Sequence, residues 1–169
     1  MSDAIRVGLV GFGYASKTFH APLIGGTPGM ALKAVASSDA DKVHADWPGV
    51  KVMSAPGDLL DDPDIDLVVI ATPNDTHFPL AKAALEAGKH VVVDKPFTVT
   101  LSQARELESL AKHCGRILSV FHNRRWDSDF LTVSALINEG QLGEVCYFES
   151  HFDRFRPQVR QRWREQAGP

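Results

Sequence analysis

The chain has 169 residues, of which 44% are hydrophobic and 23% are charged, and its formal net charge is −3. This length is sufficient for one well-packed core and the start of a second. The slightly negative charge argues against a nucleic-acid partner, and no run of eighteen apolar residues predicts a membrane span. Cys114 and Cys146 lie far apart and fit neither a metal site nor a disulfide framework, so we expect a reducing, cytoplasmic location.

Strand-like and helix-like segments alternate along the first 122 residues with short connections. Short β-branched runs predict strands, and longer segments with helical periodicity predict helices. The predicted strands are 5–10, 31–37, 50–53, 67–72, 90–93 and 116–121. The predicted helices are 16–24, 41–46, 57–60, 75–87 and 101–113, the last of them capped by Thr100. Six strands joined by crossovers indicate a doubly wound parallel α/β domain, a Rossmann sheet, over residues 1–122.

The remaining residues, 123–169, have a different character. A helix is predicted over 128–139, and residues 144–152 alternate between apolar and polar, which predicts an antiparallel strand with one apolar face. Nothing later in the chain can pair with this strand, and an unpaired half-apolar strand promotes aggregation. We therefore expect a fragment: a complete dinucleotide-binding domain and the truncated start of an α+β domain with a mainly antiparallel sheet.

A glycine-rich loop, Gly11-Phe12-Gly13-Tyr14-Ala15-Ser16, lies between the first predicted strand and the first predicted helix. Gly11 permits a tight turn, Gly13 lets the backbone approach a pyrophosphate, and the small Ser16 permits close packing of helix on strand. The helix N-terminus also attracts phosphate charge. The pattern predicts that a dinucleotide is bound by Gly11, Phe12, Gly13, Tyr14 and Ala15. The alternative is a structural turn in an α/β protein without a cofactor.

The end of the second predicted strand bears on the choice of cofactor. Chains that bind NAD usually carry an acid there, which holds the ribose hydroxyls, whereas here Ser37 and Ser38 precede Asp39. A carboxylate repels a 2′-phosphate, while serine hydroxyls can donate to one and Lys42 can neutralise it. The sequence therefore favours NADP over NAD. Alternatively, Ser37 and Ser38 cap the helix that follows.

Two further loops follow the carboxyl ends of predicted strands, where open parallel sheets bind their ligands. After the fourth strand, Thr72, Pro73, Asn74 and His77 are expected on the nicotinamide side of the cofactor. Asn74 or Asp75 can also simply cap the next helix.

After the sixth strand, Asn123, Arg124 and Trp126 are candidates for the substrate side. Arginine binds polar oxygens and tryptophan can form the wall of a pocket. The alternative is a hinge between domains in which the arginines pair with nearby acids such as Asp127.

The most informative segment is the fifth strand, in which three valines lead directly into Asp94-Lys95-Pro96. A titratable ammonium beside a carboxylate at a carboxyl strand end is a candidate for proton chemistry. The alternative is a turn that ends the strand and carries solvated charges.

These motifs resemble the glucose–fructose oxidoreductase / inositol dehydrogenase / rhizopine catabolism (Gfo/Idh/MocA) family. The resemblance runs through the whole chain in the loops at 11–16, 72–77, 94–96 and 123–127. With the later Arg162-Trp163-Arg164, it extends to the subgroup of NADP-dependent scyllo-inositol dehydrogenases. It implies hydride transfer between NAD(P) and a carbon that bears a sugar or cyclitol hydroxyl.

The resemblance also implies roles for individual residues. Lys95 is the catalytic lysine, which contacts the reacting hydroxyl and positions or polarises it. Asp94 stands where the family usually has glutamate, and it orients Lys95 or the nicotinamide ribose on the cofactor side. The Lys95–Pro96 bond is expected to be cis.

A second catalytic group, a histidine in an Asp-x-x-x-His pattern, should follow residue 169 according to the same resemblance. We therefore expect this chain to bind dinucleotide and to turn over little by itself. The implied partners are a small polyol or sugar substrate and, for the full-length form, further copies in a homo-oligomer. No metal is expected. The alternative class is a non-catalytic dinucleotide-binding sensor or regulatory module, which would have no need of Lys95.

Overall fold

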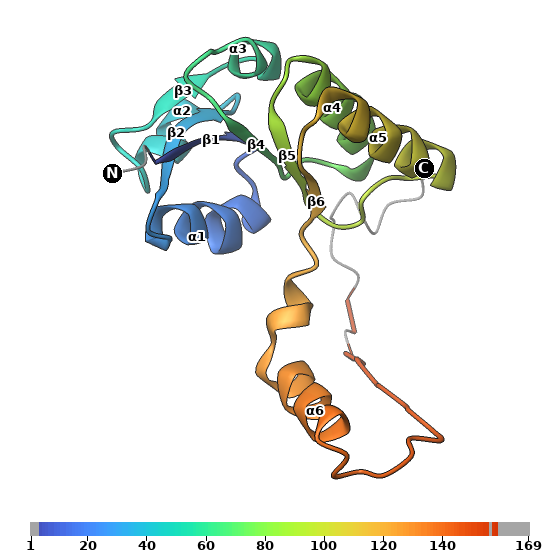
Figure 1. Cartoon of the computed structure of the whole chain (residues 1–169). Coiled ribbons are helices and arrows are strands. Elements are labelled where there is room, and N and C mark those ends of the chain that lie inside the picture. The colour runs from blue at the N-terminus through green and yellow to red at the C-terminus, as the bar shows by residue number, and fades with distance from the viewer. Residues whose placement is uncertain (1–3, 156, 159–169) are drawn as a thin grey trace. The chain divides into compact units, whose positions relative to one another are not determined.

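The computed structural model describes residues 4–155 and 157–158 (Figure 1). The chain divides into two units, and the boundary between them in the sequence lies between Phe121 and His122. The first unit contains a parallel sheet with helices on both of its faces (Figure 1). Its strands are β1 Ile5–Val10, β2 Met30–Ala36, β3 Lys51–Met53, β4 Leu67–Ile70, β5 His90–Val93 and β6 Leu118–Val120.

The sheet has the strand order β3-β2-β1-β4-β5-β6. The direction of winding therefore reverses between β1 and β4, at the position where doubly wound sheets bind ligands. The register keeps the carboxyl ends level, because Val10 pairs with Ile70, Ile70 with Val93, and Val93 with Val120. Loops that are distant in sequence thus leave the sheet along one edge. The predicted doubly wound α/β fold is confirmed.

The helices of the first unit are η1 Ser16–His20, α1 Ala21–Gly26, α2 Ala40–His44, α3 Pro56–Leu60, α4 Asn74–Glu86 and α5 Leu101–Cys114. All the predicted strands and helices of this unit are present, with small shifts at their ends. Thr100 caps α5 as predicted, since its hydroxyl accepts from the backbone N–H of Gln103 and the Gln103 side chain accepts from the N–H of Thr100. The first predicted helix differs, because it begins with the π-helical turn η1.

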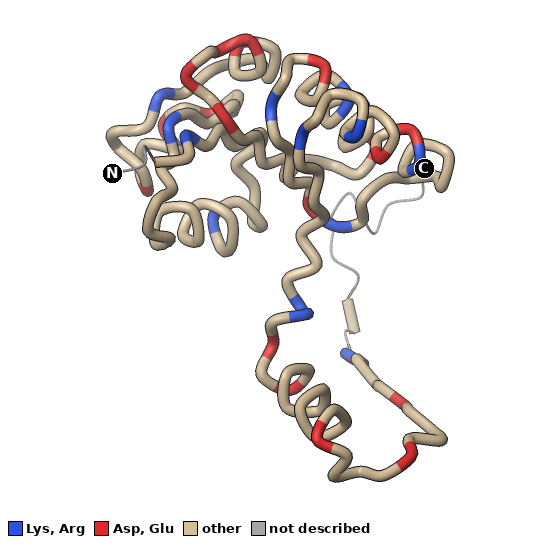
Figure 2. Tube along the Cα trace, in the orientation of Figure 1, with Lys and Arg blue, Asp and Glu red and all other residues tan. Residues whose placement is uncertain are grey.

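The sheet buries a hydrophobic cluster on each face, since successive strand residues point to opposite sides. On one face, β-branched residues such as Val68, Ile70 and Val91 pack with residues of α3, α4 and α5. On the other, Val7, Leu9 and others pack with residues of α1 and α2. This two-sided burial explains the continuous apolar runs in the strands. Charges of both signs lie along the connecting segments and helices (Figure 2).

The second unit contains the short 3₁₀ helix η2 Asn123–Trp126 and the helix α6 Ser128–Asn138. The predicted helix is confirmed, but the predicted strand over 144–152 is wrong, because these residues follow an irregular path without strand pairing (Figure 1). A strand requires a neighbour for its backbone hydrogen bonds, and the described residues provide none there. Tyr147, Phe148 and Phe152 are accordingly exposed. Among the described residues, no helix is both long and apolar enough to cross a membrane.

Candidate functional site

The glycine loop after β1 has the geometry that close approach of a ligand requires. Gly11 has a φ of 87°, and a Cβ there would lie 2.9 Å from the carbonyl oxygen of Ala71, so this position needs glycine. A Cβ at Gly13 would meet nothing within 4 Å, which leaves open space above the loop. Ser16 is fully buried, and its hydroxyl donates to the carbonyl oxygen of Gly11 at 2.7 Å. The loop therefore fits a dinucleotide pyrophosphate at Gly13.

The other residues predicted in this loop differ in their exposure. The Phe12 side chain is buried in the core, and the Lys17 ammonium lies 5.8 Å from the centre of its ring. Phe12 can therefore offer a ligand only its backbone. Tyr14 is exposed and contacts Phe19 edge-to-face. Ala15 directly precedes η1.

The serines predicted to favour NADP lie just beyond β2, where Ser38 is exposed and Ser37 is half-buried. The alternative that these serines cap α2 is wrong. The cap is Asp39, whose carboxylate accepts from the backbone N–H of Lys42 at 3.0 Å. Asp39 thus serves the helix that follows, and the Ser37 hydroxyl accepts from the N–H of Asp39 at 3.2 Å.

The loop after β4 begins α4 without a side-chain cap. The expectation that Asn74 or Asp75 caps this helix is wrong, because Pro73 occupies the N-cap position and the Thr76 hydroxyl donates to the carbonyl oxygen of Pro73 at 2.6 Å. Oδ1 of Asn74 is instead buried without a hydrogen-bond partner among the described residues. Since buried acceptors are normally paired, this oxygen fits a donor group of a bound cofactor.

His77 lies in the first turn of α4. Its side chain is fully buried, with Nδ1 2.8 Å from the carbonyl oxygen of Pro96 and Nε2 2.9 Å from that of Thr72. The ring has no accessible surface, so His77 can support the cofactor side only through the loops that it holds, and its place there stays a prediction. A doubly protonated ring can donate to both oxygens, while a neutral ring can donate to one. His77 connects the Thr72 loop to the turn that follows β5.

The turn after β5 brings Asp94 and Lys95 to the same edge of the sheet. The Asp94 N–H donates to the carbonyl oxygen of Ile70 at 2.8 Å, and the Lys95–Pro96 bond is cis, as the family resemblance predicts. The Asp94 side chain is 10% exposed, whereas Lys95 is exposed to solvent. Burial raises the pKa of Asp94, but the His20 imidazole, the Lys95 N–H and the Lys95 charge together bring that pKa below its ordinary value. Asp94 is therefore an anion beside an accessible ammonium.

Sequence reasoning missed His20, which is buried and has Nε2 3.7 Å from Oδ1 of Asp94. This is an ion-pair distance and is longer than a hydrogen bond. A histidine inside an apolar helical segment gives no signal that separates a core residue from a site residue. His20 lies in η1, which follows β1, whereas Asp94 follows β5. The two residues are far apart in sequence and become neighbours only when the chain folds.

The residues predicted for the substrate side belong to the second unit. Asn123, Arg124 and Trp126 lie in η2, and the Arg124 guanidinium donates to the Asp127 carboxylate at 2.6 Å. The alternative that an arginine there pairs with a nearby acid is thus confirmed for Arg124. Trp126 is 78% exposed.

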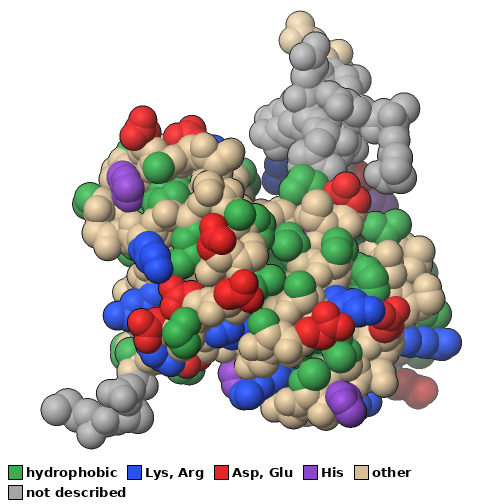
Figure 3. Space-filling view, turned by 90° about the horizontal axis from the view of Figure 1, so that it is seen from above, with side chains coloured by type: hydrophobic (Ala, Val, Ile, Leu, Met, Phe, Trp, Pro, Cys, Tyr) green, Lys and Arg blue, Asp and Glu red, His purple; other side chains and the backbone are tan. Residues whose placement is uncertain are grey.

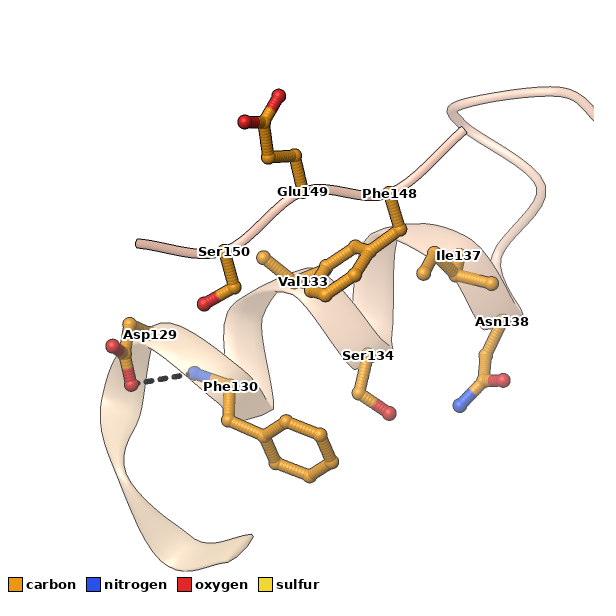
Figure 4. Close-up of a pocket in the computed structure, with 9 residues that line it drawn as sticks. All are labelled: Asp129, Phe130, Val133, Ser134, Ile137, Asn138, Phe148, Glu149 and Ser150. Atoms are coloured by element: carbon orange, nitrogen blue, oxygen red, sulfur yellow. Dashed lines mark hydrogen bonds between the residues drawn. The ribbon is translucent and has the colours of Figure 1, made fainter. Parts of the chain in front are cut away.

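Two grooves are lined by other residues. One, of about 400 Å³, is formed in the second unit by α6 and residues 148–150, and Phe130, Val133 and Phe148 are among the residues that line it (Figure 4). The other, of about 830 Å³, lies in the first unit near residues that begin strands, such as Ile5, Leu67 and His90. Among the described residues, no group of three or more histidine, cysteine or acidic residues could hold a metal ion.

The sheet order, the glycine loop and the edge formed by the loops after β4 and β5 are the features of a dinucleotide-binding domain. Residues 5–122 match the oxidoreductase family described as having an NAD-binding Rossmann fold, and residues 134–169 match the C-terminal alpha/beta domain of the same family. The chain belongs to the Gfo/Idh/MocA family.

Named relatives agree with this assignment. Over 169 residues the chain is 78% identical to the uncharacterized oxidoreductase YdgJ of Escherichia coli, covering all of this chain and 49% of that protein. It is 39% identical to scyllo-inositol 2-dehydrogenase (NADP(+)) IolW of Bacillus subtilis, covering 98% of this chain and 46% of that protein. The chain thus spans about half the length of the curated relatives it matches.

Solved structures show the same fold. The YPO2259 protein of Yersinia pestis superimposes with a TM-score of 0.94 at 71% identity, covering 98% of this chain and 47% of that one. A biliverdin reductase of Synechocystis, solved in complex with biliverdin and NADP+, superimposes with a TM-score of 0.72 at 35% identity, covering 83% of this chain and 44% of that one.

The open space at Gly13 leads to a prediction about binding. Gly13→Ala should leave the folding free energy within about 0.5 kcal/mol of wild type, because its new methyl group meets no protein atom. The same methyl group should weaken NADPH binding about tenfold or more, since it occupies the space left for the pyrophosphate. Isothermal titration and urea unfolding measure the two effects. Gly57→Ala, at an exposed glycine of α3 with similar open space, is the control and should bind normally; equal affinity in both variants would contradict the assignment of the loop.

Proposed function

We propose that the protein containing this chain is an NADP-dependent dehydrogenase that transfers a hydride between the cofactor and a sugar or cyclitol hydroxyl. The observation that carries the proposal is the turn after β5. It presents an exposed Lys95 beside the buried, anionic Asp94, at the strand edge that the glycine loop shares.

The turn can supply the polar chemistry of such a reaction. Bound NADP would supply the hydride acceptor, and the loop at Gly13 and the buried Oδ1 of Asn74 would hold it. The Lys95 ammonium can donate to the substrate oxygen and stabilise the negative charge that develops there as the hydroxyl proton passes to a general base, for which the family resemblance implies a histidine. Asp94 keeps this ammonium oriented. Asn123, Arg124 and Trp126 are proposed for the substrate side.

The preference for NADP rests on the exposed Ser38 beyond β2 and on Asp39 being engaged as the cap of α2. The name of the Bacillus subtilis relative specifies NADP(+), and the Synechocystis reductase was solved with NADP+. The cyclitol class is supported by two named relatives, the scyllo-inositol dehydrogenase and an inositol 2-dehydrogenase of Rhodococcus jostii that is 30% identical over 148 residues.

The same proposal extends to partners and location. On the face shown in Figure 3, acidic and basic side chains are intermixed among the described residues, which favours a small-molecule partner over nucleic acid. Cys114 and Cys146 are free, which favours a reducing compartment such as the cytoplasm. We propose a homo-oligomer for the full-length form. A non-catalytic dinucleotide sensor is the competing function. The two functions differ in Lys95, which a dehydrogenase needs for turnover and a sensor does not need.

Cofactor choice can be tested at Ser38. Ser38→Asp should weaken NADPH binding about tenfold or more, because the new carboxylate repels the 2′-phosphate, and should leave NADH binding equal or tighter. Fluorescence titration with both cofactors measures the change. Ser109→Asp, at an exposed serine of α5, adds the same charge elsewhere and should alter neither affinity. A parallel loss of NADPH and NADH affinity in Ser38→Asp would speak against a 2′-phosphate at this position.

The catalytic role of Lys95 can be tested in the full-length protein with scyllo-inositol and NADP+. Lys95→Met keeps the length of the side chain and removes its charge, so kcat should fall about 100-fold or more, while NADPH affinity should stay within about threefold. Lys112→Met, at an exposed lysine near the C-terminal end of α5, is the matched control for turnover. Undiminished turnover in Lys95→Met would refute the enzymatic role, and NADPH binding without turnover in wild type would favour the sensor.

A further inference from the structure

The first turn after the glycine loop is π-helical. The backbone N–H of Ala21 donates to the carbonyl oxygen of Ser16, which closes a turn that is one residue wider than an α-helical turn. Both ends of this turn are buried, with Ser16 at 0% and His20 at 3% exposure. The wide turn therefore directs two polar side chains into the protein, Ser16 to the glycine loop and His20 to the loops beyond the sheet.

His20 lies across the carboxyl ends of two strands on the other half of the sheet. Its ring centre is 4.3 Å from that of Phe121, which follows β6, and Nε2 is 3.7 Å from Oδ1 of Asp94, which follows β5. Nε2 is buried, and it has no hydrogen-bond partner among the described residues. Buried polar atoms are normally satisfied, so an unpaired nitrogen directed at a carboxylate requires an explanation.

We propose that His20 is a positioning residue that holds the Asp94 carboxylate and through it sets the orientation of Lys95. This inference rests on the proposed function of Lys95. The Phe121 ring fixes the plane of the imidazole, and Nε2 faces one carboxylate oxygen. The other oxygen of Asp94 is then left for Lys95 or for a ribose hydroxyl of the cofactor. The contact between His20 and Asp94 also joins η1, which follows the glycine loop, to the turn that bears Lys95.

The charges at this contact come from a small set of groups. Within the described chain, the titratable side chains that act on Asp94 are His20, from η1, and Lys95, from the turn itself. Burial of Asp94 works in the opposite direction and favours its neutral form. Without His20, only Lys95 would oppose the effect of burial on Asp94, so the pKa of Asp94 should rise.

Two variants of His20 test the proposal. His20→Leu fills the space without a donor, whereas His20→Gln keeps an N–H donor at a similar reach. In the full-length protein with ¹³C-labelled aspartate, the titration midpoint of the Asp94 carboxyl carbon should rise in His20→Leu and should rise by less in His20→Gln. Asp94→Asn assigns the signal. A midpoint that is unchanged in the leucine variant would overturn the proposal. If that variant does not fold, an unchanged midpoint in His20→Gln would do so.

Turnover gives an independent measurement. With scyllo-inositol and NADP+, kcat should fall about tenfold in His20→Leu, recover in part in His20→Gln, and leave KM for NADP+ within about twofold of wild type. In a variant that already carries Asp94→Asn, His20→Leu should cause no further loss of kcat, because both substitutions remove the same contact. Fully additive losses would show that His20 acts independently of Asp94, contrary to the proposal. If wild type oxidises no cyclitol, the proposed function fails, while the titration still decides the role of His20.

Discussion

The site depends on the register of the parallel sheet. Because Val10, Ile70 and Val93 pair in one row, the loops that follow β1, β4 and β5 leave the sheet at a common level. The strands are buried on both faces, so a slip of a strand by one residue would exchange its side chains between the two clusters and disrupt the packing of both. The hydrophobic core thereby fixes the relative positions of polar loops that are up to about eighty residues apart in the sequence.

Two buried histidines connect the turn that bears Lys95 to the neighbouring loops. His77 contacts the carbonyl oxygens of Thr72 and Pro96 and so joins the loops after β4 and β5. His20 approaches Asp94 from the turn that follows the glycine loop. Lys95 itself remains exposed, as its proposed contact with substrate requires. Both imidazoles are thus buried, and the ammonium for which we propose a catalytic role is exposed.

The sequence predicts much of the fold and part of the site. The β-branched runs and the capping pair of Thr100 and Gln103 are local signals, and they gave the strands, the helices and the cap. The segment over 144–152 has an equally clear local pattern but forms no strand, because pairing is not a local property. Single residues were harder to assign: Asp39 rather than either serine caps α2, and His20 reaches Asp94 only through the π-helical turn and the strand order. Such contacts depend on tertiary structure.

In the proposed binding mode, one dinucleotide spans the glycine loop and the turn after β5. Titration of NADP+ into the ¹⁵N-labelled chain, followed by amide chemical shifts, tests it directly. The account predicts that the signals of Gly13, Asn74 and Lys95 move together along one binding curve. It would be contradicted if Gly13 moved while Asn74 and Lys95 did not, or if the largest changes fell at Ile5 and His90, at the opposite ends of the strands.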